Sequence, residues 1–189
     1  YGRNLDPAWC TQEFWGDNFF YWAFFCENVG GAEEHFEEDI RKSLLTVHMS
    51  ASGDSGPSID QQGKKTMLEA APAPPAELPS WMTEEDLDYY AEAYRQSGFR
   101  GGLNWYRNIP YFLTDTSELE GRKISQPSIF ITGSEDPVRK MTGGRTGSEL
   151  FEDLHSVHVI EGPGHWVQLE AVEETCLLYT SDAADDTPC

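Results

Sequence analysis

The chain has 189 residues, and its 33 acidic side chains against 13 basic ones give a formal net charge of -20. Nucleic-acid binding requires a cationic face that displaces phosphate counterions, and anionic membranes attract basic segments, so this charge argues against both partners. The 6 Trp, 10 Phe and 8 Tyr residues argue against disorder, because large aromatic side chains drive burial. The acidic excess favours solubility more than any particular fold.

The longest apolar run, over residues 19–26, is far shorter than the roughly 20 residues that span a bilayer. We therefore expect no membrane insertion, and no basic segment followed by an apolar stretch indicates a signal peptide. None of the cysteines has a metal-ligand spacing, which predicts no metal or cofactor site and weakly indicates a reducing, cytoplasmic location. These cysteines are Cys10, Cys26, Cys176 and Cys189.

The first half of the chain predicts helices around a long loop. Residues 1–17 have weak periodicity and indicate a loop or a short helix, and residues 19–26 indicate a short strand or part of a buried aromatic wall. Apolar side chains recur about every 3.6 residues over 32–49, which predicts one helix. The Pro- and Ala-rich stretch 50–79 predicts a long loop, of the kind found in lids and caps.

A second helix begins after Thr83. The sequence Thr83-Glu84-Glu85-Asp86 is a capping-box pattern, and Gly98 suits the position after the helix end. We expect the buried stripe of this helix to be Leu87, Tyr90, Ala91 and Tyr94. An aromatic-rich segment follows over residues 103–108.

The second half predicts a β-α-β unit with parallel strands. The short apolar run at 127–133 predicts a strand that is buried on both faces, and 157–160 predicts its partner. Residues 141–154 are long enough for a crossover helix, although their glycines weaken that prediction. A last helix is expected to begin at 167 and to stop early, by 175.

Residues 176–189 continue no pattern of the preceding chain. They resemble the translation of a sequencing adapter, so we expect them to be an artefact and leave them out of the fold prediction. The chain begins at Tyr1 and not at Met, which suggests a fragment.

Each predicted strand is followed by a loop that carries one ionisable side chain. Asp136 lies three residues after Gly133, and His165 lies five residues after Ile160. Ligands of open parallel sheets bind beyond the carboxyl ends of the strands. An acid followed by a histidine is also the chain order of α/β-hydrolases, where the carboxylate orients the imidazole that takes a proton from water. Alone, Asp136 could be a turn residue and His165 an ordinary loop residue.

Longer motifs narrow the class. The segment Gly98-Phe99-Arg100-Gly101-Gly102-Leu103-Asn104-Trp105-Tyr106-Arg107-Asn108 resembles the lid motif of soluble epoxide hydrolases. Glu135-Asp136-Pro137-Val138 resembles the acid motif of that family, and Gly164-His165-Trp166-Val167-Gln168-Leu169-Glu170 its histidine motif. The resemblance runs from about residue 16 to residue 175 in one order.

The resemblance implies a partial α/β-hydrolase fold: a mostly helical cap over 1–115, which includes the loop 50–79, and the last parallel strands of the core over 116–175. It also implies hydrolysis of an apolar epoxide by water to a vicinal diol, without a cofactor. In the family, an Asp nucleophile forms an alkyl-enzyme ester, two lid tyrosines protonate the epoxide oxygen, and a His–Asp pair activates the water. Tyr106, Asp136 and His165 match these motifs, and Tyr21 is the candidate for the other tyrosine.

Some features depart from the family pattern. The segment 19–22 carries one residue more than the family pattern, so Phe20 is the alternative to Tyr21 for that position, and it could not donate a proton. No nucleophile elbow is found; Asp54 in Ser-Gly-Asp-Ser-Gly has no strand before it and indicates a turn. His155 and His158 are three residues apart but do not suggest a metal site.

We therefore expect the chain alone to be inactive, and to fold poorly because its strand edges are exposed. Two other functions remain open for an intact protein. One is a haloalkane or haloacid dehalogenase on the same scaffold, and the other is a non-catalytic ligand-binding relative. The sequence gives neither the substrate nor the oligomeric state.

Overall fold

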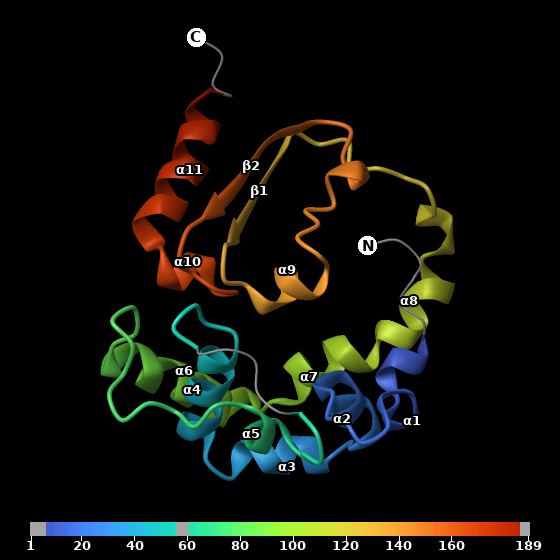
Figure 1. Ribbon diagram of the computed structural model, residues 1–189, viewed down its shortest axis with the longest axis vertical. Helices are drawn as coiled ribbons and strands as arrows, with labels where there is room; N and C mark the ends of the chain where they lie inside the picture. Colours follow the sequence, from blue (N-terminus) through green and yellow to red (C-terminus); the bar gives the residue numbers. More distant parts are fainter. Residues whose placement is uncertain (1–6, 56–60, 186–189) are drawn as a thin grey trace. The chain divides into compact units, whose positions relative to one another are not determined.

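A computed structural model describes residues 7–55 and 61–185 of the chain (Figure 1). The chain forms two compact units, which are described separately. The first unit comprises Tyr1–Ser50, Pro57–Leu78 and Thr83–Arg122, and the second comprises Ala51–Gly56, Pro79–Met82 and Lys123–Cys189. The domain boundary expected at 115/116 stays a prediction.

Among its described residues, the first unit consists of helices joined by loops, with one isolated bridge between Asn18 and Gln62. Helix α4 packs against α6, and α2 packs against α7. The centre of this unit includes Phe36 and Leu87, whose side chains are fully buried. Its elements are η1 (Pro7–Cys10), α1 (Gln12–Trp15), α2 (Tyr21–Glu27), α3 (Gly31–Glu37), α4 (Ile40–Ser50), α5 (Met67–Ala70), α6 (Glu84–Ser97), α7 (Arg100–Arg107), α8 (Ile109–Asp115) and η2 (Ser117–Leu119).

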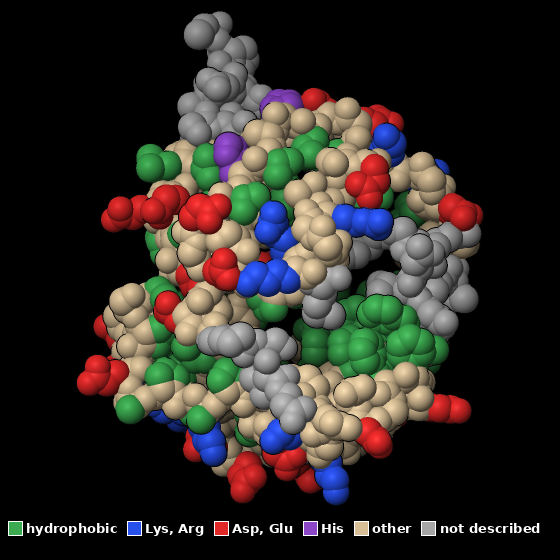
Figure 2. All heavy atoms as spheres, viewed as in Figure 1, with side chains coloured by type: hydrophobic (Ala, Val, Ile, Leu, Met, Phe, Trp, Pro, Cys, Tyr) green, Lys and Arg blue, Asp and Glu red, His purple; other side chains and the backbone are tan. Residues whose placement is uncertain are grey.

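The apolar run at 19–26 forms helix α2, so the strand alternative for it was wrong. The aromatic-wall alternative agrees with the burial: Phe19, Phe20 and Phe25 are each at most 6% exposed. A short apolar run fits a buried helix as well as a buried strand, because periodicity alone does not distinguish them. Figure 2 shows hydrophobic side chains gathered in the region where Figure 1 labels α2 and α8, and acidic side chains spread over the same face of the molecule.

The single helix expected over 32–49 is two helices, α3 and α4. Asp39 lies between them, and its side-chain Oδ1 accepts a hydrogen bond from the backbone N–H of Lys42 at 3.1 Å. A carboxylate that binds an N–H three residues later starts a new helix. The apolar stripe continues across the break, and Phe36 and Leu44 are both buried.

The predicted capping box of α6 is confirmed. The hydroxyl of Thr83 accepts from the N–H of Asp86 at 3.1 Å, and the carboxylate of Asp86 accepts from the N–H of Thr83 at 2.9 Å. Gly98 follows the helix with φ +66°, a conformation that favours glycine. In the expected stripe, Leu87 and Ala91 are buried and the two tyrosines are partly exposed.

The second unit contains the two predicted strands, β1 (Ser128–Gly133) and β2 (Leu154–Ile160), which pair in parallel as expected. The register pairs Gly133 with Ile160, so both strands end at the same level. The expectation that β1 is buried on both faces was wrong, because most of its residues are only partly buried. Among the described residues the sheet has only these two strands.

The crossover helix expected over 141–154 was also wrong. The chain forms the short helix α9 (Pro137–Met141) and then the 3-10 turn η3 (Ser148–Leu150). Gly143, Gly144 and Gly147 all have positive φ. An α-helix cannot continue through such residues, because its backbone requires negative φ.

The last helix does not stop at 175. It is interrupted at Ala171 between α10 (Val167–Glu170) and α11 (Val172–Asp185). The adapter origin proposed for residues 176–189 stays a prediction, and part of that segment lies outside the described residues.

The stretch 50–79 is mostly loop and turn, as expected, with the short helix α5 inside it. Residues 56–60 lie outside the described ranges. Asp54 lies in a turn, and its carboxylate accepts a hydrogen bond from the indole N–H of Trp81 at 2.9 Å. Within 7–55 and 61–185, no helix is long and apolar enough to cross a bilayer.

Candidate active site

The acid loop begins where β1 ends. Asp136 is the N-cap of α9: its Oδ1 accepts from the backbone N–H of Val138 at 2.8 Å, and Pro137 occupies the first turn, where its missing N–H costs nothing. Asp136 is 9% exposed. Its carboxylate is therefore held by the first turn of a helix.

The histidine loop begins where β2 ends. Nδ1 of His165 lies 3.2 Å from Oδ1 and 3.3 Å from Oδ2 of Asp136. The His165 side chain is 40% exposed, while that of Asp136 is 12% exposed. One ring nitrogen thus faces a carboxylate and the ring remains open to water, which is the arrangement that a general base needs.

The two loops are linked through their backbones. The N–H of Glu135 donates to the carbonyl of Pro163 at 3.0 Å, and the N–H of Gly162 donates to the hydroxyl of Ser134 at 3.0 Å. A Cβ on Gly133 would lie 2.1 Å from the Pro163 carbonyl oxygen. The close approach of the loops, which brings Asp136 to His165, therefore depends on glycine at 133.

Sequence reasoning missed Glu170 as part of this arrangement. Its carboxylate accepts hydrogen bonds from the backbone N–H groups of Gly164 and Trp166, on both sides of His165. The only signal in the sequence was its place at the end of the histidine motif. Nothing local in that motif could reveal its other partners, which come from residues 51–53.

The two candidate tyrosines meet in the first unit. Tyr21 is the first residue of α2 and Tyr106 lies near the end of α7, and their ring centroids are 5.5 Å apart in an edge-to-face arrangement. The ring of Phe25 is 5.0 Å from that of Tyr106. The alternative residue, Phe20, instead stacks on Trp15 at 4.1 Å. The packing favours Tyr21 as the partner of Tyr106.

Burial changes the acidity of both phenols. Desolvation, with a smaller contribution from the neighbouring Tyr106, raises the pKa of Tyr21 to about 12. Burial also raises the pKa of Tyr106. Both groups therefore keep their protons well above neutral pH and can serve as hydrogen-bond donors.

An ion pair fixes the residue next to Tyr106. Arg107 donates to both oxygens of Glu33, at 2.7 and 2.8 Å, and its Nε donates to the carbonyl of Phe25 at 2.8 Å. The thiol of Cys26 contacts the carbonyl of Tyr106 at 3.5 Å. These contacts join α7, which carries Tyr106, to α2, which carries Tyr21, and to α3.

The two histidines that lie three residues apart have partners of their own. His155 pairs with Asp153 at 3.2 Å, and His158 contacts the hydroxyl of Ser156 at 2.9 Å. Among the described residues, no group of three or more His, Cys, Asp or Glu side chains could hold a metal ion.

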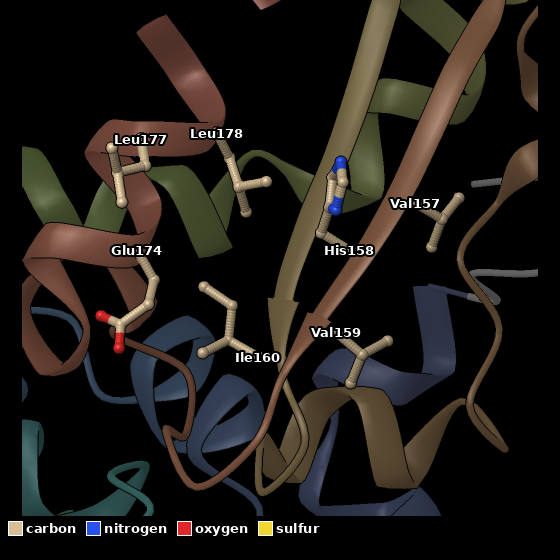
Figure 3. Close-up of a pocket in the computed structure, with 7 residues that line it drawn as sticks. All are labelled: Val157, His158, Val159, Ile160, Glu174, Leu177 and Leu178. Atoms are coloured by element: carbon tan, nitrogen blue, oxygen red, sulfur yellow. The ribbon is translucent and has the colours of Figure 1, made fainter. Parts of the chain in front are cut away.

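A cavity of about 540 Å³ in the second unit is lined by none of the four candidate residues. Figure 3 shows its lining side chains, which come from β2 and α11. Part of the lining, Leu177 and Leu178, belongs to the segment 176–189, whose origin is in question. We assign no function to this cavity.

Curated proteins similar to this chain are named as epoxide hydrolases. The chain is 37% identical over 175 residues to Epoxide hydrolase A of Mycobacterium tuberculosis, a match that covers 88% of this chain and 52% of that protein. It is 33% identical over 175 residues to Epoxide hydrolase 1 of Siraitia grosvenorii, covering 87% and 52%. No family model matches the chain.

Solved structures of epoxide hydrolases are also similar to this chain. The crystal structure of Epoxide Hydrolase A from Mycobacterium thermoresistibile matches with a TM-score of 0.82 and 31% identity, over 96% of this chain and 57% of that one. A laboratory-evolved variant of potato epoxide hydrolase matches with a TM-score of 0.80 and 28% identity, over 98% and 59%. The chain thus has part of the fold of these enzymes and spans about half the length of the curated relatives it matches.

Proposed function

We propose that this chain, a homologue of the epoxide hydrolases of the α/β-hydrolase fold, provides the proton-donating tyrosines and the acid–base pair of an enzyme that converts epoxides to vicinal diols. The nucleophile, a carboxylate, is proposed to come from the part of the relatives that this chain does not span. The expected substrate is a small apolar epoxide, and water is the second reactant. A cytoplasmic location stays a prediction.

The tyrosines serve the first step of the proposed reaction. When a carboxylate attacks an epoxide carbon, the C–O bond breaks and the ring oxygen becomes an alkoxide. That oxygen needs a donor that is still protonated at neutral pH. Tyr21 and Tyr106, whose pKa values are raised, are two such donors. Two donors that share one developing charge act as an oxyanion hole.

The His–Asp pair serves the second step. A water molecule attacks the carbonyl carbon of the alkyl-enzyme ester and loses a proton to Nε2 of His165. Asp136, 3.2 Å from Nδ1, stabilises the imidazolium that results. The ester C–O bond then breaks and the leaving oxygen takes the proton from the imidazolium, which releases the diol. The second proton of the water returns to the tyrosine that protonated the epoxide oxygen, and the nucleophilic carboxylate is restored.

The observation that carries this proposal is the contact between Tyr21 and Tyr106. A His–Asp pair beyond parallel strands occurs in hydrolases of many kinds, so it does not specify the substrate. Two partly buried tyrosines from different helices with centroids 5.5 Å apart fit a leaving oxygen that must be protonated.

The test restores the missing part. The full chain would be fused behind the complementary amino-terminal portion of Epoxide hydrolase A from Mycobacterium tuberculosis, and diol formation would be measured with an aryl-substituted epoxide. We expect turnover, and a loss of about 10²-fold in the ring-opening rate for Tyr106→Phe, the effect of removing one oxyanion donor. Tyr89→Phe is the matched control, since that ring is 75% exposed.

The histidine variant separates the two steps. In the fusion, His165→Gln should open one equivalent of epoxide and then stop, with the substrate mass added to the protein. Release of halide from an alkyl halide without diol from any epoxide would favour a dehalogenase instead. Ligand binding by a folded fusion without turnover would favour the non-catalytic relative. Diol formation by the isolated chain would contradict the placement of the nucleophile elsewhere.

A further inference from the structure

We propose that Glu170 is a positioning residue that holds the loop of His165 in the conformation that brings its imidazole to Asp136. The inference rests on the proposed function only for the role given to His165. Every contact that carries it lies within the second unit, between residues 51–53 and 162–170.

The Glu170 carboxylate accepts four hydrogen bonds. Its Oε2 accepts from the hydroxyl of Ser52 at 3.0 Å, from the N–H of Gly53 at 2.8 Å and from the N–H of Gly164 at 3.0 Å. Its Oε1 accepts from the N–H of Trp166 at 3.2 Å. One side chain therefore fixes the backbone on both sides of the histidine.

A second anchor holds the histidine itself. Its backbone N–H donates to the carbonyl of Ala51 at 2.7 Å. The segment 51–53, which Glu170 also binds, thus lies directly against the loop. The three consecutive N–H groups of Gly164, His165 and Trp166 all have acceptors in this arrangement, so the direction of the His165 Cβ is determined by the backbone around it.

The packing leaves no room for a side chain at the two glycines where the segments meet. A Cβ on Gly164 would lie 2.3 Å from the Ala51 carbonyl oxygen, and a Cβ on Gly53 would lie 2.0 Å from the Gly162 carbonyl oxygen. Real Cβ atoms do not approach backbone oxygen so closely. The two segments meet backbone to backbone, and the Glu170 carboxylate is the acceptor that their N–H groups share.

Substitution of Glu170 should therefore affect His165 without substrate. With ¹⁵N-labelled chain, ring nitrogen shifts at a pH where the imidazole is neutral report which nitrogen carries the proton. Wild type should carry it on Nδ1, facing Asp136. Glu170→Ala should give a mixture of tautomers, and the His165 amide should exchange at least about tenfold faster because the loop opens locally.

Two further variants separate positioning from general stability. In Glu170→Gln the amide oxygen can replace Oε2 and keep its three donors, while the amide nitrogen cannot accept from Trp166. We expect the wild-type tautomer with faster exchange only at the Trp166 amide. Ser52→Ala is the matched control, since it removes one donor and leaves both peptide groups beside His165 bound; it should keep the wild-type tautomer.

The amides of β1 and β2 serve as the internal reference for folding. The proposal is overturned if Glu170→Ala keeps the Nδ1–H tautomer and the wild-type exchange of His165 while the strands stay protected. It is equally overturned if the wild-type His165 amide exchanges as fast as exposed loop amides. Should Glu170→Ala lose strand protection too, Glu170→Gln decides, and wild-type exchange at Trp166 in that variant rejects the role. Since neither readout needs an epoxide, failure of the fusion to form diol would count against the proposed function alone.

Discussion

Replacing Glu33 with glutamine should destabilise the chain at neutral pH, and this destabilisation should be much smaller in acid. The Arg107 hydrogen bonds are the main cause of a pKa for Glu33 of about 2, against its ordinary value of 4.5. The Glu33 side chain is 7% exposed and that of Arg107 12% exposed, so solvent screens the pair little. At about 1.4 kcal/mol per pKa unit, the ionised state of Glu33 contributes about 3 kcal/mol at pH 7.

The sign follows from the direction of the pKa change. A carboxyl whose pKa is lower in the folded state stabilises the fold above its unfolded pKa, and this stabilisation is lost as the pH falls through the folded pKa. For Glu33 the window runs from pH 4.5 down to about 2. The pH-dependent contribution should fall from about 3 kcal/mol at pH 7 to about 1.5 kcal/mol at pH 3.

The assay is urea unfolding followed by far-ultraviolet circular dichroism, which reports chiefly the helices of the first unit. The free energy difference between wild type and Glu33→Gln would be measured at pH 7 and pH 3, and it should shrink by about 1.5 kcal/mol. Glu34→Gln is the control, because Glu34 is exposed on the same helix, and it should change stability by no more than about 0.5 kcal/mol. A Glu33→Gln difference of the same size at both pH values would refute the reasoning.

Three other changes test the caps, the loop contact and the buried phenol. Thr83→Ala removes the cap that binds the Asp86 N–H and should lower the free energy of unfolding by about 1 kcal/mol in the same urea assay. Gly133→Ala puts a Cβ 2.1 Å from the Pro163 carbonyl oxygen, so the two loops must move apart. If the variant folds, its Asp136 and His165 amide resonances should differ from those of the wild type. The pKa of Tyr21 is raised to about 12. The stabilisation that its protonated form contributes is therefore present below pH 10 and is lost as the pH rises towards 12. Tyr21→Phe should reduce alkaline unfolding, and an unchanged alkaline transition would contradict the burial of that phenol.

The sequence predicted correctly those elements that depend on interactions between residues close together in the chain. The capping box at Thr83 requires only residues within one helical turn. Short apolar runs predicted strands at 127–133 and 157–160, and the structure has strands at 128–133 and 154–160. The wrong helix at 141–154 shows the limit of a length argument, since the glycines at 143, 144 and 147 determine the backbone there. The break at Asp39 could have been anticipated, because aspartate favours the start of a helix.

Sequence motifs predicted only some of the contacts in the candidate site. Asp136 and His165 follow strands that end at the same level, so chain order and parallel pairing were enough to expect their contact. Tyr21 and Tyr106 are brought together by the packing of α2 on α7 and by the Glu33–Arg107 ion pair, which joins residues 74 positions apart. Two of the partners of Glu170, Ser52 and Gly53, lie 118 and 117 positions away. Such contacts depend on the assembled chain, and no short-range pattern encodes them.

The cap of α9 has a consequence for which acid the site can use. Oδ1 of Asp136 both accepts the Val138 N–H and faces the imidazole of His165. A glutamate at this position has one more methylene, so its carboxylate could reach the ring only by leaving the helix end without its cap. The site thus selects aspartate through the geometry of a helix start, and any movement of the first turn of α9 is transmitted directly to the histidine.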